Sequence, residues 1–148
     1  MNRKTFCRIF LSTILVSVLF VSCTKKSTES VAGKVSGVIT ISPELAAKLK
    51  PETDVLYIIA RNQQVGPPTA VKRIIKPQFP LQYVIGPEDA MMPGTQGFVA
   101  GENVTIAARI SRTGNAMPST GDLEGAFKNN PAHPGDGGVD VLIEKERP

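Results

Sequence analysis

The stretch VTIAARIS, residues 104–111, decides the fold class because apolar side chains alternate with others along it. Successive side chains of a β-strand point to opposite faces of the sheet, so the two parities separate here. One parity is wholly apolar and consists of Val104, Ile106, Ala108 and Ile110. The other parity consists of Thr105, Ala107 and Arg109. We expect the first set to face a core and the second to face solvent, where Arg109 is a solvated surface residue or grips a partner's carboxylate.

Similar short runs, rich in β-branched and aromatic residues, lie on both sides of this stretch, between clusters of Gly, Pro and Asn. Together they predict strands at Val35–Ile41, Val55–Arg61, Thr69–Lys76, Leu81–Ile85, Val104–Ser111 and Val139–Glu144. Each run has a length that strands prefer. The last run alternates in the same way. Its apolar face consists of Val139, Val141 and Ile143, and its other face consists of Asp140, Leu142 and Glu144. One core face per strand is typical of an antiparallel β-sandwich, so the sequence predicts an all-β fold.

A short helix is expected between the first two strands. Ser42 is a good N-cap residue, Pro43 suits the first helical position, and Glu44 complements the positive end of the helix dipole. Helix-forming residues follow as far as Pro51, where a helix cannot easily continue. The sequence shows no internal repeat and no coiled-coil heptad.

The first 22 residues differ in composition from the rest of the chain. Three basic residues, Arg3, Lys4 and Arg8, precede an apolar run of about 13 residues, whereas a membrane-spanning helix needs roughly 20. A basic segment followed by a short apolar segment is typical of a secretory signal peptide. We therefore expect residues 1–22 to be removed and the remainder to be exported.

The leader ends in LFVSC, residues 19–23, which resembles the lipobox of bacterial lipoproteins, although Phe20 stands where Leu is more frequent. In those proteins the cysteine is acylated and becomes the new N-terminus. Cys7 would leave with the leader, so the exported chain would keep no second thiol for an intramolecular disulfide. We expect lipidation at Cys23 and an anchored protein that faces the periplasm. Because Thr24 is not the Asp associated with retention in the inner membrane, the outer membrane is favoured.

The remaining chain divides into a tether and one domain. Residues 23–33 are polar and cannot bury enough surface to fold alone, so they are expected to form the lipidated tether. Residues 34–148 have the length of a single domain. Without the three basic residues of the leader, 14 basic side chains oppose 13 acidic ones. This near balance gives no reason to expect a nucleic-acid partner.

Motifs for catalysis or cofactor attachment are missing from the sequence. It contains no C-x-x-C-H, C-x-x-C, H-E-x-x-H or G-x-S-x-G, and the whole chain has one His and no Trp. Its acidic residues are scattered, with no evident pair on a shared element. We expect neither an enzyme nor a bound cofactor.

The order and spacing of four blocks resemble the C-terminal Ig-like periplasmic domain of the cytochrome c-type biogenesis protein H family. These blocks are VSGVITISPELAAKLKPETDVLYIIAR (35–61), PTAVKRI (68–74), FPLQYVIGPEDAMMPG (79–94) and VTIAARISRTGNAMPSTGDLEG (104–125). In that family the domain usually follows membrane helices and a tetratricopeptide array, and the whole protein delivers apocytochrome c for haem ligation. Neither of those parts occurs in this sequence. The resemblance implies an Ig-like β-sandwich and an accessory role in c-type cytochrome maturation, with apocytochrome c or the maturation proteins as partners.

A partner surface is expected in GPEDAMMPGTQGFVAG, residues 86–101, which combines turn residues with large apolar ones. Met91, Met92 and Phe98 are the contact candidates, because a thioether adapts to varied apolar partners and an aromatic ring offers a large area. The alternative is that these three side chains fold back and plug the open end of the sandwich. Asp89, and Asp122 in a later turn, are expected to cap local backbone N–H groups.

Two other functions remain open at this point. Met91, Met92 and Met117, with His133, could handle copper or another soft metal. A loop histidine in solvent is the plainer interpretation of His133, because one His rarely makes a metal site. The protein could also be a structural lipoprotein of the envelope with no part in maturation.

Overall fold

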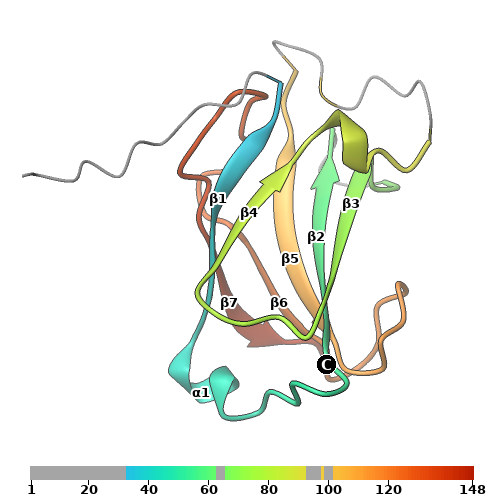
Figure 1. The fold of residues 1–148 in the computed structure, drawn as a ribbon, viewed down its shortest axis with the longest axis vertical. Coiled ribbons are helices and arrows are strands. Elements are labelled where there is room, and N and C mark those ends of the chain that lie inside the picture. Colours follow the sequence, from blue (N-terminus) through green and yellow to red (C-terminus); the bar gives the residue numbers. More distant parts are fainter. Residues whose placement is uncertain (1–32, 63–65, 93–97, 99–101) are drawn as a thin grey trace, which may run out of the picture.

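Figure 1 shows the computed structural model of the protein, which describes residues 33–62, 66–92, 98 and 102–148. In chain order its elements are β1 (Val35–Ile41), α1 (Pro43–Ala46), β2 (Val55–Arg61), β3 (Ala70–Ile75), β4 (Leu81–Ile85), the 3-10 turn η1 (Pro87–Asp89), β5 (Thr105–Ser111), β6 (Leu123–Phe127) and β7 (Val141–Glu146). The predicted all-β class is confirmed. The predicted signal peptide, Cys23 and most of the tether lie outside the described residues.

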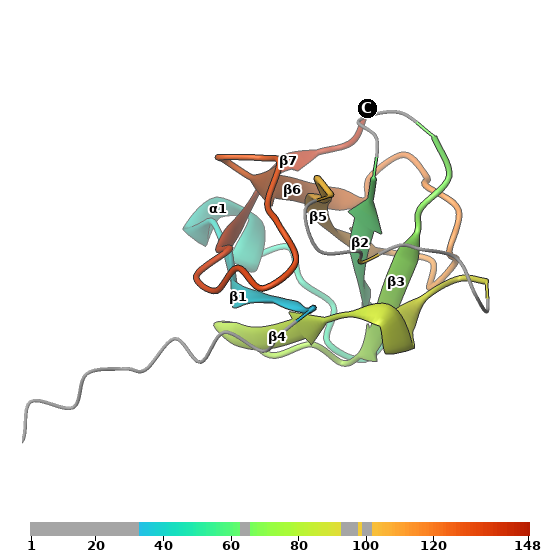
Figure 2. The same ribbon diagram turned by 90° about the horizontal axis from the view of Figure 1, so that it is seen from above.

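The strands form one mixed sheet in the order β3-β2-β5-β6-β7-β1-β4. Figures 1 and 2 show that this sheet curls around a common interior, so that its two end strands, β3 and β4, come together. Every pairing is antiparallel except that of β1 with β7, where Ile39 lies opposite Val141 in a parallel register. The expectation of a wholly antiparallel sandwich is therefore wrong at this pair, because the last strand returns beside the first in the same direction.

The seam between β3 and β4 is closed at one end by backbone and in the middle by a side chain. Ala70 forms an isolated antiparallel bridge with Ala90, and the N–H of Met91 donates to the carbonyl of Thr69 at 2.9 Å. Further along, Nζ of Lys72 donates to the carbonyl oxygen of Val84 at 2.8 Å. β4 is an edge strand, so no further strand of the described chain pairs with its outer side. Lys72 of β3 instead donates a hydrogen bond to a carbonyl oxygen on that side.

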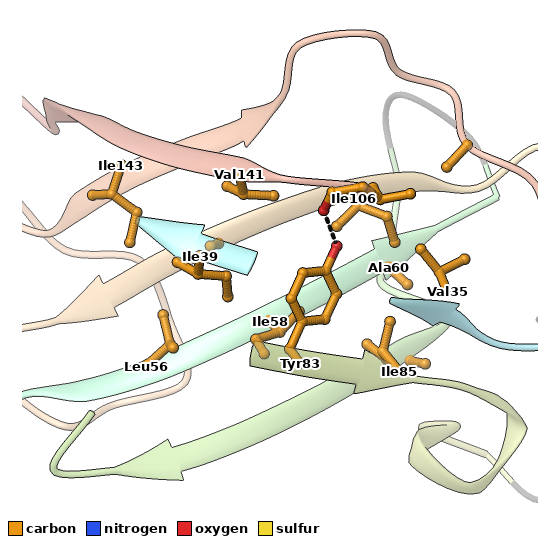
Figure 3. Packing of buried hydrophobic residues seen from close by; sticks show 14 of the residues in the cluster. Val35, Ile39, Leu56, Ile58, Ala60, Tyr83, Ile85, Ile106, Val141 and Ile143 are labelled. Atoms are coloured by element: carbon orange, nitrogen blue, oxygen red, sulfur yellow. Dashed lines mark hydrogen bonds between the residues drawn. The ribbon is translucent and has the colours of Figure 1, made fainter. Parts of the chain in front are cut away.

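The core lies between the facing parts of the curled sheet (Figure 3), and it follows the predicted alternation. Val104, Ile106, Ala108 and Ile110 are all buried, and so are Val139, Val141 and Ile143. Inside the core, the hydroxyl of Tyr83 donates to the carbonyl oxygen of Val139 at 2.7 Å, the dashed bond in Figure 3. Gly37 permits this arrangement, since a Cβ at that position would stand 2.1 Å from the same carbonyl oxygen.

Several predicted boundaries differ from the structure, by one residue at both ends of β3 and at the start of β5. The helix stops at Ala46, well before Pro51, and the Ser42 side chain makes no cap hydrogen bond. Instead, the backbone carbonyl of Ser42 accepts from Leu45 and Ala46, and one turn suffices because it buries Leu45 against the core. The last strand runs from Val141 to Glu146 and not from Val139 to Glu144.

The sequence analysis missed strand β6. Its residues, LEGAF, contain one buried leucine followed by half-buried or exposed positions, so the alternation is weak. A β-bulge between Glu124 and Gly125 shifts the register with β7 and interrupts the pattern further. Gly125 is required at the bulge, because a Cβ there would stand 2.0 Å from the carbonyl oxygen of Leu142.

Candidate functional site

A shallow groove of about 800 Å³ lies on the outer face of β2, β5, β6 and β7. Most of its residues come from the outward parity of these strands, and the loop that follows β5 contributes Pro118. A concave surface with apolar and polar groups is the usual form of a binding site. We therefore treat this groove as the candidate site.

One continuous apolar row crosses the groove from strand to strand. The strand registers place Ile59 opposite Ala107, Ala107 opposite Ala126, and Ala126 opposite Leu142. Leu142 is 44% exposed, which is high for a leucine on a sheet. The two alanines have short side chains, so the middle of the row projects little from the sheet. The backbone or small side chains of a partner can approach the sheet closely there.

Charged side chains border this apolar row at both ends of the groove. Arg61, Lys128 and Asp140 line one end, and Glu124, Glu144, Lys145 and Arg147 line the other. Arg147 and Glu124 form an ion pair at 2.9 Å. The border therefore carries both signs of charge, as is common around the apolar centre of a protein-binding surface.

Arg109 is not the solvated residue that its outward parity suggested. It is 4% exposed, and its Nη1 pairs with Oδ2 of Asp122 at 2.5 Å, while Asp122 has no exposed surface. The guanidinium also lies 5.1 Å from the ring centre of Tyr57. The expectation of a solvated Arg109 is therefore wrong, because the loop after β5 folds back and covers it with a carboxylate.

Several bonds hold this covering loop, residues 112–122, against the sheet. Arg109 donates to the carbonyl oxygens of Ala116 and Met117, and the Tyr57 hydroxyl donates to that of Gly114 at 2.8 Å. Asp122 accepts from the backbone N–H groups of Ser119 and Arg112, which confirms its predicted capping role. The loop wall of the groove is thus fixed by a buried charged pair, which makes the groove a preformed feature.

Asp89 likewise caps the turn at the end of β4. Its Oδ2 accepts from the N–H of Gly86 at 3.1 Å, as predicted, and also lies 3.4 Å from Nζ of Lys72. Beside it, Glu88 pairs with Lys34 at 2.6 Å. The hydrogen bond from Lys34 holds the pKa of the Glu88 carboxyl below its usual value.

The predicted contact residues separate into two groups. Met91 and Met92 are 58% and 63% exposed, so they do not plug the end of the sandwich, and that alternative is wrong for them. Phe98 is 7% exposed and belongs to the core cluster, which corrects its assignment as a surface contact. Contact of Met91 and Met92 with a partner stays a prediction.

The residues proposed for a soft metal do not come together. Met91 and Met92 follow η1, next to the start of β3, whereas Met117 belongs to the loop after β5. Since Ser111 and Ile75 both lie opposite Val55, that loop leaves from the far end of β3. His133 lies in a third loop, where its Nδ1 is 3.6 Å from Oδ2 of Asp136. In the described part of the chain, no three His, Cys, Asp or Glu side chains gather as metal ligands.

Sequence reasoning missed the groove. The available signal was Ala107, a small residue on the outward parity of a strand, but its neighbour Ala126 belongs to the strand that was not recognised. Without β6, the apolar row could not be assembled from the sequence.

Among the described residues, no helix is long and apolar enough to cross a membrane.

Comparisons with known proteins agree with this fold. Residues 35–144 match the family model of the cytochrome c-type biogenesis protein H Ig-like domain. An uncharacterized protein of Aquifex aeolicus (strain VF5) is 28% identical over 144 aligned residues, which cover 89% of this chain and 92% of the relative. No solved structure gives a significant match. The family match spans β1 to β7, and the chain therefore belongs to the cytochrome c-type biogenesis protein H Ig-like domain family.

Proposed function

We propose that the protein is a lipid-anchored module of the cell envelope that faces the periplasm and assists c-type cytochrome maturation by binding polypeptide. The observation that carries the proposal is the family match over residues 35–144. The binding partner is apocytochrome c or a maturation protein, and the anchor is an acylated Cys23, with the outer membrane favoured. The protein performs no chemistry itself.

The groove on β2, β5, β6 and β7 is the best surface for such binding. Its apolar row, with Leu142 exposed, offers the contact that an unfolded segment needs, and its border of both charges can orient that segment. The buried Arg109–Asp122 pair fixes one wall before a partner arrives. A preformed wall lowers the entropy that binding must overcome.

Retention of a peptide by the full-length acylated protein tests the proposal. The probe is an apocytochrome c peptide that contains the C-x-x-C-H haem-attachment motif, with its thiols blocked. The control probe is an unrelated unfolded peptide of equal length and charge. We expect selective retention of the first peptide. Equal retention of both would contradict the proposal and favour a structural lipoprotein of the envelope.

A pair of variants locates the binding surface. Leu142→Glu places a charge in the apolar row and should weaken peptide binding by at least about tenfold, a loss of about 1.4 kcal/mol. Met117→Glu is the matched control, because Met117 is 75% exposed and does not line the groove. Both variants should melt at the temperature of the wild type. If Leu142→Glu binds as well as Met117→Glu, the groove is not the binding surface.

A further inference from the structure

The end of the domain where the described chain begins also exposes two large apolar side chains. Lys34 is the residue before β1, and its Nζ bonds to Glu88 of η1 at 2.6 Å. Met91 and Met92 follow η1 after one intervening residue and are more than half exposed. In Figure 1 this is the end opposite α1. The start of the domain and the two methionines therefore share one end of the sheet.

The length of the preceding chain limits how far this end can lie from a membrane. Gly33, the first described residue, lies ten positions after Cys23. Ten Cα–Cα steps span at most about 35 Å, whatever conformation the chain adopts. If Cys23 carries the lipid, the end with the methionines stays within this distance of the bilayer.

We infer that the side chains of Met91 and Met92 insert into the interfacial region of the lipid bilayer and orient the tethered domain on it. This inference rests on the proposed acylation of Cys23. Long apolar side chains favour the acyl boundary over water, and tethering keeps them at a high effective concentration beside it. The same orientation directs the sides of the sheet, including the groove, along the membrane surface, where an exported polypeptide can reach it.

Tryptophan fluorescence tests the inference with little background, because the sequence contains no Trp. Met91→Trp and Met92→Trp each introduce a single reporter into the full-length protein, and acylation is checked by mass spectrometry. The samples are reconstituted in vesicles of phosphatidylethanolamine and phosphatidylglycerol, with and without brominated acyl chains. We expect a blue-shifted emission that brominated lipid quenches and aqueous iodide does not.

Met117→Trp is the matched control, since Met117 is an exposed methionine in a loop at the opposite end of the sheet. Its emission should stay red-shifted and respond to iodide alone. Combining Cys23→Ser with Met91→Trp gives the second control, whose soluble released form carries no acyl chain, so that the reporter should be in water. A circular dichroism melt of each variant confirms that the fold is intact.

Each outcome decides between the proposals. If the chain is acylated and the emission of Met91→Trp matches that of Met117→Trp, the bilayer inference fails while the anchor stands. If mass spectrometry finds no acyl chain, the anchor fails and the inference falls with it. If a haem-attachment peptide, without vesicles, shifts the emission of Met91→Trp, the methionines contact protein and the inference is overturned.

Discussion

Asp122 holds the guanidinium of Arg109 at 2.5 Å in a place where neither side chain reaches water appreciably. The arginine belongs to β5 and the aspartate precedes β6, so this bond joins the two ends of the 112–122 loop. Because Arg109 also bonds to carbonyl oxygens within the loop, one side chain organises the whole segment.

Replacement of Arg109 should destabilise the fold. Arg109→Met leaves the carboxylate of Asp122 buried without its charged partner, which should lower the free energy of unfolding by about 3–5 kcal/mol. Arg109→Lys should recover only part of this, because an ammonium cannot reproduce the planar fork of donors. Urea unfolding measures both. Arg73→Met, at an exposed position of β3, is the control and should be nearly neutral; a similar loss there would show that the pair has no special weight.

The two faces of β5 should differ sharply in their tolerance of truncation. Ile106→Ala or Ile110→Ala removes a fully buried side chain and should cost about 2–5 kcal/mol through lost transfer energy and the remaining cavity. Thr105→Ala, on the other face, should stay within about 1 kcal/mol. Thermal melts of the three variants provide the comparison, and equal losses on both faces would contradict the inward orientation of Ile106.

Tyr83 should give the fold a dependence on alkaline pH. Burial, and then the negative charge of Asp140, raises the pKa of its hydroxyl well above the usual 10.0. The folded state thus keeps a proton that the unfolded state releases, so this contribution is complete below pH 10 and declines as the pH rises beyond it. Tyr83→Phe should lose about 1–3 kcal/mol at neutral pH, since the carbonyl of Val139 loses a donor.

The same variant should also show a shallower decline of stability above pH 10 than the wild type. Urea midpoints measured at pH 7, 9 and 11 test this. A parallel decline in both proteins would mean that other groups account for the alkaline loss.

Cys23→Ser tests the anchor itself. The exported wild type should be cleaved before Cys23, acylated and found in the membrane fraction, because several acyl chains give stable anchoring. The variant should remain as an uncleaved precursor or be released as a soluble form. Mass spectrometry and fractionation measure both properties, and a variant that is still processed and membrane-bound like the wild type would exclude a lipobox.

Strands whose pattern is local were predictable from the sequence. Ile106 and Val141 alternate with outward residues regardless of their partners, so parity alone assigned them to the core. Arg109 could not be assigned in this way, because its burial depends on a carboxylate 13 residues away that a folded loop brings back. Local pattern reports which side of a strand a residue occupies, but not whether a loop covers that side.

The candidate site was less predictable for a related reason. Met91 and Met92 are exposed and Phe98 is buried, although all three are large apolar residues in one segment. Met91 and Met92 follow the bridge between Ala70 and Ala90, a contact between distant parts of the chain that the local sequence does not report. The groove likewise depends on the registers of four strands, one of which contains a bulge.

Lys72 has a consequence for how the protein behaves at high concentration. Strand edges with unpaired carbonyl groups can template the addition of strands from neighbouring molecules, which leads to aggregation. Here the ammonium of Lys72 donates a hydrogen bond to the carbonyl oxygen of Val84. It thereby places a positive charge between β3 and β4, the two edge strands of the sheet in the described chain. An approaching strand would have to displace this charge and bury it. Molecules at high concentration are therefore kept from pairing edge to edge.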